Sequence, residues 1–208
     1  MAEPRFRPAD VTLDLSGGGR HAEPMRLTIL LCLLAGPAWA DACDDWWFTR
    51  NLVIDRAGYC FGSVLGQAQF DNTGCIGTTV TLDPASAAAV ARIRQLETEN
   101  QCRVNTAQPV LNLIDRDIRL QLQAQPIADI FESACLRYRA TPLPLHNAPD
   151  PSAPVIGQVL PGDRVSFAHL PAGNWSYVTS HQGSFPGLRS GGWLGTPIRT
   201  PDCEQWAG

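Results

Sequence analysis

The chain has 208 residues, which is enough for one domain or two small ones. It carries 16 basic residues against 20 acidic ones, for a net charge of −4, and none of the basic residues is lysine. This mildly acidic composition argues against nucleic acid as a partner, because nucleic-acid binding depends on clustered positive charge. Anionic lipid is disfavoured too, since the sequence has no polybasic segment.

A secretory signal peptide is predicted at residues 25–40. Its start is positively charged, an apolar run follows at 27–35, and an Ala-x-Ala cleavage site closes it at 38–40. We therefore expect an exported, periplasmic or extracellular protein that begins at Asp41. The apolar run has about half the length of a membrane span, so no stable membrane insertion is expected after cleavage.

Residues 1–24 are polar and show no strong periodicity. A signal peptide rarely follows such a preface. We interpret this stretch as a mis-annotated upstream extension, with translation starting at Met25. The alternative is an unusually long n-region of the same signal peptide.

Six cysteines remain once the signal peptide is removed. They are Cys43, Cys60, Cys75, Cys102, Cys135 and Cys203. An even number in an exported chain predicts a disulfide framework. Zinc is the alternative, but there is no C-x-x-C pair and few histidines are available as ligands. We expect neither a metal nor another cofactor.

Two helices are predicted in the first part of the exported chain. Asp44 and Asp45 are suitable N-cap residues for the first, and Gly58 is a natural stop. Ser63 is a suitable N-cap for a second, short helix that extends to Phe70. A cluster of turn-forming residues follows directly.

The clearest helix extends from Pro84 to about Gln101. Asp83 is its predicted N-cap, and proline is favoured at the first helical position. Its apolar stripe consists of Val90, Ile93, Leu96 and Ala89. A helix with one apolar side needs a partner, and we expect the first helix to be that partner.

Residues 106–134 carry a weaker signal and are predicted to form a connector. The stretch from Ile118 to Gln123 alternates with period two, which favours a strand, although a short helix also fits. The stretch from Pro126 to Ser133 fits one or two helical turns.

Residues 135–208 predict a small all-β barrel, because short β-prone runs alternate with turns rich in proline and glycine. The runs lie near Tyr138 and at residues 155–156, 165–167, 175–178 and 193–194. The turn at 161–163 lies between two of these runs, as in a hairpin.

The segment 47–63, WFTRNLVIDRAGYCFGS, resembles the YARHG domain of bacterial cell-surface proteins. The matching residues are Arg50, Asn51, Ile54, Arg56, Gly58, Tyr59, Phe61 and Ser63, with Phe70 as a later aromatic. Asp55 and Ala57 depart from the family's Ala and His. The resemblance spans residues 43–102, within a helical module that we place at 41–105. It also extends to exported alphaproteobacterial proteins of unknown function, and it implies action on envelope components without a catalytic role.

Four motifs in residues 136–200 resemble the bacterial SH3-like domain. They are LPLHNAPDPSAPVIG at 143–157, PGDRV at 161–165, NWSYV at 174–178 and GWL at 192–194. Asn147, Ala148 and a Gly/Ser-rich insertion at 181–190 depart from that family. The expected fold class is therefore α+β, with a small disulfide-stapled helical module followed by an SH3-like β barrel.

The two resemblances also imply a disulfide pairing. The ends of an SH3-like barrel lie close together, which implies Cys135–Cys203. If the first and last helices of the N-terminal module pack antiparallel, Cys43 meets Cys102, and Cys60–Cys75 is left. This is one of the many connectivities that six cysteines allow.

Candidate ligand residues fall into two groups. Those of the helical module are Arg50, Asn51 and Arg56, and those of the barrel are Tyr138, His146, Trp175, Tyr177 and His181. Arginine binds carboxylates with two parallel hydrogen bonds, and peptidoglycan stem peptides carry carboxylates. Aromatic side chains line the grooves of SH3 domains. The alternative is structural: the arginines pair with Asp44, Asp45 or Asp55, Asn51 caps a loop, and the aromatic residues pack the barrel, as expected for Trp193.

No catalytic site is predicted, because the histidines lack a nucleophile partner and no G-x-S-x-G motif is present. We expect a non-catalytic binding protein of the cell envelope that recognises peptidoglycan or an envelope protein. The alternative is an accessory or inhibitor that binds a partner enzyme through the insertion at 181–190. A cell-wall hydrolase is the third and least favoured class.

Overall fold

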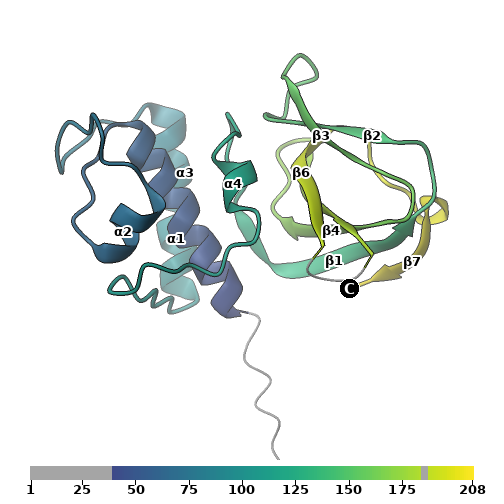
Figure 1. The fold of residues 1–208 in the computed structure, drawn as a ribbon, viewed down its shortest axis with the longest axis horizontal. Helices are drawn as coiled ribbons and strands as arrows, with labels where there is room; N and C mark the ends of the chain where they lie inside the picture. The colour runs from purple at the N-terminus through teal and green to yellow at the C-terminus, as the bar shows by residue number, and fades with distance from the viewer. Residues whose placement is uncertain (1–38, 184–186) are drawn as a thin grey trace, which may run out of the picture. The chain divides into compact units, whose positions relative to one another are not determined.

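Four helices form the N-terminal part of the structure, a computed structural model that describes residues 39–183 and 187–208. They are α1 (Trp39–Arg56), α2 (Val64–Gln69), α3 (Pro84–Glu99) and the single turn α4 (Arg116–Arg119) (Figure 1). The predicted extension and signal peptide lie outside the described residues, except for positions 39 and 40. In the part of the chain that is described, no helix combines the length and apolar character that a membrane crossing requires.

The ends of the helices follow local capping rules at two of three predicted positions. Ser63 accepts a hydrogen bond from a backbone N–H at the start of α2, and Asp83 does the same at the start of α3, which confirms both predictions. The predicted N-cap at Asp44 and Asp45 is wrong. Because α1 already begins at Trp39, both aspartates lie inside the helix.

The first and third helices pack against each other as predicted. Ile93 of α3 is fully buried and lies in one apolar cluster with Trp46 of α1. The disulfide Cys43–Cys102 joins the start of α1 to the segment after α3. A second disulfide, Cys60–Cys75, closes the loop around α2.

A different side of α1 packs onto the loop that carries α2, and the two form a second apolar cluster. The buried residues of this cluster are Trp47, Phe48, Leu52, Phe61, Leu65 and Phe70. The ring of Phe70 stacks on Phe48 and Phe61 at centroid distances of 5.4 and 4.8 Å. The long helix α1 is therefore buried on two sides, which makes it the centre of the helical part.

One of the two alternatives for the stretch from Ile118 is wrong, because no strand forms there. Ile118 and Arg119 belong to the short helix α4, and the residues after them form a loop. A second prediction in this region is also wrong. The stretch from Pro126 to Ser133, predicted as helical, contains the beginning of strand β1, which pairs with β4 from Ala128 onward.

Seven antiparallel strands form the C-terminal sheet, in the order β3-β2-β6-β5-β4-β1-β7 (Figure 1). They are β1 (Ala128–Tyr138), β2 (Leu143–His146), β3 (Val155–Val159), β4 (Asp163–His169), β5 (Ser176–Gln182), β6 (Leu188–Leu194) and β7 (Cys203–Ala207), with a 3₁₀ turn at Thr200–Asp202 before the last.

The hairpin predicted at 161–163 is wrong. Strand β3 pairs with β2, while β4 pairs with β1 and β5, so the turn joins strands that are not neighbours. The N–H of Gly162 in this turn donates to the carbonyl of Tyr138, 2.7 Å away.

One core holds together strands from both edges of the sheet. Val159 of edge strand β3 and Cys203 of edge strand β7 lie in the same buried cluster as Val165 and Val178. The sheet is therefore strongly curved. It is not closed, however, since no ladder joins β3 to β7 within the described strands, and a barrel is not confirmed.

The third disulfide, Cys135–Cys203, links β1 to β7 inside this core. With it, the structure contains the same three cysteine pairs that the sequence predicted. The observed architecture is thus a disulfide-linked helical region followed by an antiparallel sheet.

Candidate functional site

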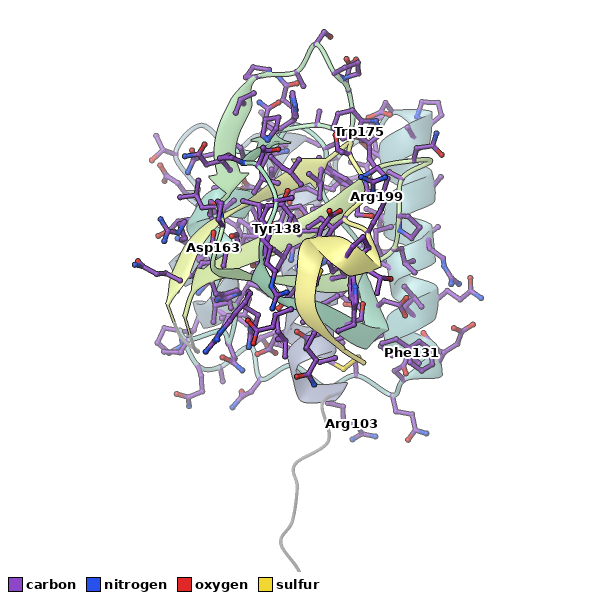
Figure 2. The ribbon with its side chains drawn as sticks, turned by 90° about the vertical axis from the view of Figure 1, so that its right-hand side faces the viewer. Arg103, Phe131, Tyr138, Asp163, Trp175 and Arg199 are labelled. Atoms are coloured by element: carbon purple, nitrogen blue, oxygen red, sulfur yellow. A yellow bond between two sulfur atoms is a disulfide. The ribbon has the colours of Figure 1, made fainter. Side chains whose placement is uncertain are left out.

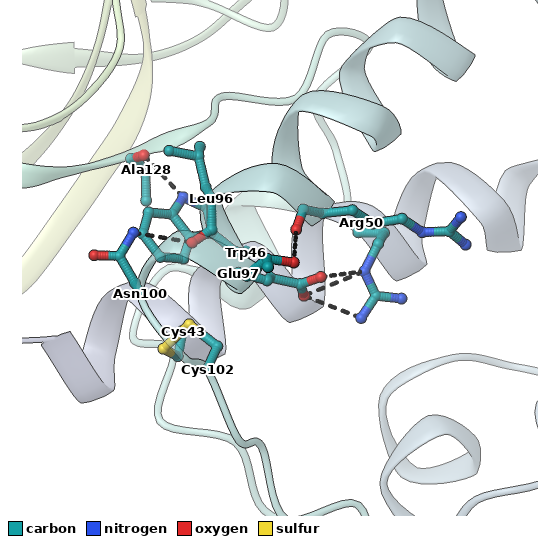
Figure 3. Close-up of a disulfide and its surroundings, with 10 residues drawn as sticks. Cys43, Trp46, Arg50, Leu96, Glu97, Asn100, Cys102 and Ala128 are labelled. Carbon is teal, nitrogen blue, oxygen red and sulfur yellow. Dashed lines mark hydrogen bonds and ion pairs between the residues drawn. A yellow bond between two sulfur atoms is a disulfide. The ribbon is translucent and has the colours of Figure 1, made fainter.

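The two predicted ligand residues in the middle of α1 are held within the helical part. The guanidinium of Arg50 lies 3.0–3.2 Å from both carboxylate oxygens of Glu97 on α3 (Figure 3). Asn51 is buried, donates to the carbonyl of Trp47 and accepts from Arg50. Arg50 does have a structural carboxylate partner, but it is Glu97 and none of the three nearby aspartates. Asn51 caps no loop.

The third predicted ligand residue of the helical part, Arg56, binds backbone. Its guanidinium donates to the carbonyls of Leu120, Leu122 and Gln123, at 2.7–3.4 Å, directly after α4. Burial lowers the pKa of Arg56 somewhat, and the charge of Asp55 opposes that shift. Arg56 thus holds the segment that follows α4 by satisfying backbone carbonyls that no ladder pairs.

The predicted aromatic residues of the sheet do not gather in one groove. Tyr138 is buried in the core and donates to the carbonyl of Thr141. Figure 2 shows it well separated from Trp175. Trp175 and His146 meet edge to face at 5.4 Å, and the His146 ring bonds the carbonyl of Ala153.

Tyr177 and His181 lie on β5 and are fully buried. The hydroxyl of Tyr177 donates to Asp115 at 2.8 Å. Burial, reinforced by the charge of Asp115, raises the pKa of Tyr177 well above its ordinary value. Burial and the charge of Arg164 lower the pKa of His181. These side chains therefore support the structure from inside, and the eight predicted residues form no common site.

The structure instead gathers polar side chains around Arg119, whose side chain is fully buried. Its guanidinium donates to the carboxylate of Asp45 and the hydroxyl of Thr49, both on α1, and to the carbonyl of Pro126. Asp45 also contacts Nε2 of His169, at the end of β4, at 3.1 Å. We call Asp45, Thr49, Arg119 and His169 the junction network.

Opposite charges dominate the electrostatics of this network. Burial by itself raises the pKa of Asp45, but Arg119 and His169 outweigh that effect and hold the pKa well below its usual range. Burial by itself lowers the pKa of Arg119, and Asp45 and Asp115 reverse this and raise it. Both groups therefore stay charged, and the ion pair is retained because each charge needs the other.

A pocket of about 270 Å³ opens beside this network. Its floor is the outer face of the sheet, with Ser166 and Ala168 of β4 and Thr179 of β5. Its walls come from the start of α1, from residues 112–115 and from residues 128–132 of β1. We call this cavity the junction pocket, and Asp45 and His169 of the junction network line it.

One wall of the junction pocket is an irregular stretch of β1. Ala128 pairs with His169 and Ser133 with Phe167, so four residues of β1 bulge out opposite a single residue of β4. The bulge leaves Phe131 75% exposed, and Figure 2 shows this ring at the periphery. A bulge of this size re-aims the side chains that would otherwise continue the ladder.

The floor holds a buried hydroxyl without a partner. Val165 belongs to the sheet core, so Ser166 beside it points to the opposite face, where the pocket lies. Ser166 is 5% exposed, and its Oγ makes no hydrogen bond to any described residue. An unpaired buried hydroxyl costs free energy, which a ligand can recover.

Sequence reasoning missed this site because its parts lie far apart in the chain. Asp45 and Arg119 are 74 positions apart, and Asp45 and His169 are 124 apart. No local pattern marks Arg119 either. It alternates with Ile118 and Leu120, so the period-two pattern assigns it to the polar face, whereas the structure buries it and leaves Leu120 39% exposed.

The residues of the junction network and the junction pocket do not form a metal site. Within 39–183 and 187–208, no three His, Cys, Asp or Glu side chains are grouped to hold an ion. The junction pocket therefore offers carboxylates, hydroxyls, one imidazole and apolar walls as its binding groups.

Comparison with known families divides the chain into two parts. The YARHG domain matches residues 34–98, which confirms that resemblance. A domain of unknown function, DUF4453, matches residues 101–208, where an SH3-like domain was expected. No curated protein and no solved structure matches the chain. The junction pocket takes walls from both matched regions, because α1 lies in the first and the sheet in the second.

We predict that Asp45→Asn destabilises the protein by about 3–5 kcal/mol, since it leaves the buried charge of Arg119 unpaired. Asp117→Asn is the matched control. Its partner Arg116 lies on the same helix at the surface, so the expected loss is below about 1 kcal/mol. Urea unfolding followed by tryptophan fluorescence measures both changes. Equal losses in the two variants would contradict the account.

We also predict that acid destabilises the protein through Asp45. Its native pKa lies below the unfolded value of about 3.9, so its contribution is complete above that pH and is lost as the pH falls below it. The urea midpoint of the wild type should therefore drop steeply below about pH 4. In Asp45→Leu/Arg119→Met, which replaces both charges by apolar groups, the drop should be shallower. If the urea midpoints of the two proteins fall in parallel with pH, Asp45 is not the source of the acid sensitivity.

Proposed function

The chain belongs to the DUF4453 family, and we propose that its DUF4453 and YARHG regions together form one non-catalytic binding protein of the bacterial cell envelope. The proposed target is peptidoglycan, bound in the junction pocket. An envelope protein is the alternative target. The observation that carries the proposal is a pocket with an unpartnered hydroxyl on its floor and walls held by a buried ion pair.

Preformed walls favour binding because little ordering is needed when the ligand enters. Asp45 and His169 fix the start of α1 against β4. Trp46, one position further along α1, donates through its indole N–H to the carbonyl of Ala128, at the base of the β1 wall (Figure 3). The pocket walls are thus tied to each other by direct hydrogen bonds.

The disulfides and the YARHG match both support a location in the cell envelope. Three disulfides persist only in an oxidising compartment, such as the periplasm or the cell exterior. The YARHG match agrees with such a location. Export through the signal peptide at 25–40 is part of the proposal.

A binding role is favoured over hydrolysis by the state of the polar groups. His169 and Asp45 form a pair like that of a hydrolase, and Ser166 lies in the same pocket. A nucleophilic serine, however, needs the imidazole within hydrogen-bond distance, and Ser166 has no such partner. The Asp45 carboxylate is also engaged by Arg119.

The accessory alternative draws its support from the β1 bulge. Phe131 is 75% and Ile130 43% exposed, an apolar surface that suits a protein partner. The insertion at 181–190 is the other surface proposed for a partner enzyme. His181 is buried, but Gln182, Gly183 and Gly187 are exposed.

The finer fold assignment also stays a proposal. We propose that the sheet is a relative of the SH3-like domain that has remained open at the β3 and β7 edges. Support comes from one core shared by both edges, from the Cys135–Cys203 link and from the register of Tyr177 with Trp193.

Retention on purified peptidoglycan sacculi tests the proposed function. The wild type should bind, and Ala168→Phe should lose most retention because the larger side chain fills the pocket floor. Ala87→Phe on the exposed face of α3 is the control and should bind like the wild type. Retention of Ala168→Phe would place the site elsewhere, and turnover of muropeptides by the pure protein would refute a non-catalytic role.

A further inference from the structure

The junction pocket has an acidic lining. Its charged residues include Asp45, Asp115, Asp129 and Glu132, and no arginine lines it. Arg119 neutralises Asp45, but its own side chain is 0% exposed and is not available to a ligand. The pocket therefore repels a ligand carboxylate or phosphate.

Three of these four carboxylates accept hydrogen bonds within the protein. Asp45 is bound by Arg119 and His169, and Asp115 accepts from Tyr177. Asp129 and Glu132 lie on the β1 bulge, which the sheet ladders leave out. One oxygen of Asp129 accepts from the backbone N–H of Ile130, 2.7 Å away. Glu132 is exposed, and Arg164 offsets part of its charge. These two carboxylates complete the acidic lining at the rim of the pocket.

The floor supplies a hydrogen-bond acceptor at the depth of the pocket. The Ser166 hydroxyl is buried and unpartnered, and Thr179 lies opposite it in the β4–β5 register. The oxygen of a hydroxyl group has lone pairs that can accept a hydrogen bond from an ammonium N–H. The remaining lining is largely apolar, with Ala42, Leu113, Ile114, Ala128, Ile130 and Ala168.

From these groups we propose that the junction pocket binds an alkylammonium group, a primary amine at the end of an aliphatic chain. The amine donates to Ser166, the rim carboxylates complement its charge, and the chain lies along the apolar walls. The inference rests on the proposed function, because it names the ligand chemistry of the same pocket. An amino-terminated side chain of a cell-wall peptide has this chemistry.

The test uses three small probes of matched length: pentylammonium, pentanol and pentanoate. They are titrated at low salt and fixed pH into ¹⁵N-labelled full-length protein, and amide shifts are followed by NMR. Pentylammonium should shift the amides of Ser166, His169 and Thr179 in a saturable way and bind most tightly. Pentanoate should bind most weakly of the three.

Variants separate the two polar contributions. Ser166→Ala removes the hydroxyl without adding a group to the floor, and it should weaken pentylammonium about tenfold, as expected for a hydrogen bond to a charged group. Glu132→Gln should weaken pentylammonium and leave pentanol unchanged. The controls are Ser86→Ala and Glu99→Gln on α3, which should not change the affinity for pentylammonium.

The outcomes distinguish this inference from the proposed function. If pentanoate shifts the same amides more strongly than pentylammonium, the amine assignment is wrong while the pocket remains a binding site. If no probe shifts these amides but sacculi still retain the protein, the ligand class is overturned and the proposed function stands. If sacculi retention also fails, both proposals fall.

Discussion

The buried charge of Arg119 is the constraint on which the rest of this structure depends. A guanidinium without solvent contact needs a carboxylate and several acceptors close by. Asp45 and Thr49 on α1 supply them, and Asp45 is also held by His169 on β4. A single charge thereby fixes α1, α4 and β4 together, and the described residues from Trp39 onward belong to one compact unit.

A second set of buried contacts orders the stretch of little regular structure between α4 and β1. Between α4 and β1 the carbonyls are taken by side chains from both sides: Arg56 of α1 bonds three of them and Trp193 of β6 bonds that of Ala124. Buried backbone groups need partners, and here side chains replace a ladder. This ordered stretch leads into the β1 wall, so the shape of the junction pocket follows from it.

Local rules account for what the sequence could predict. Ser63 and Asp83 cap helices through neighbouring N–H groups, and the strands follow β-prone runs. The site depends on contacts between residues far apart, which no local pattern encodes. The local pattern predicts Asp45 as a cap, but α1 begins at Trp39 and the partner of Asp45 lies 74 positions away. Arg50 and Arg56 were predicted as ligand residues from their type alone, and the structure gives both of them partners within the protein.

The central claim is that the junction network joins the helical part and the sheet into one cooperative unit. The junction pocket, which is lined by residues of both parts, needs this connection. Native-state hydrogen exchange tests this claim most directly, because it reports the free energy of opening at each amide. The account predicts that slowly exchanging amides of α1, such as Leu52, and of β5, such as Val178, open with the same free energy. It also predicts that Asp45→Asn lowers both by an equal amount. A variant in which Leu52 exchanges faster while Val178 stays unchanged would contradict it.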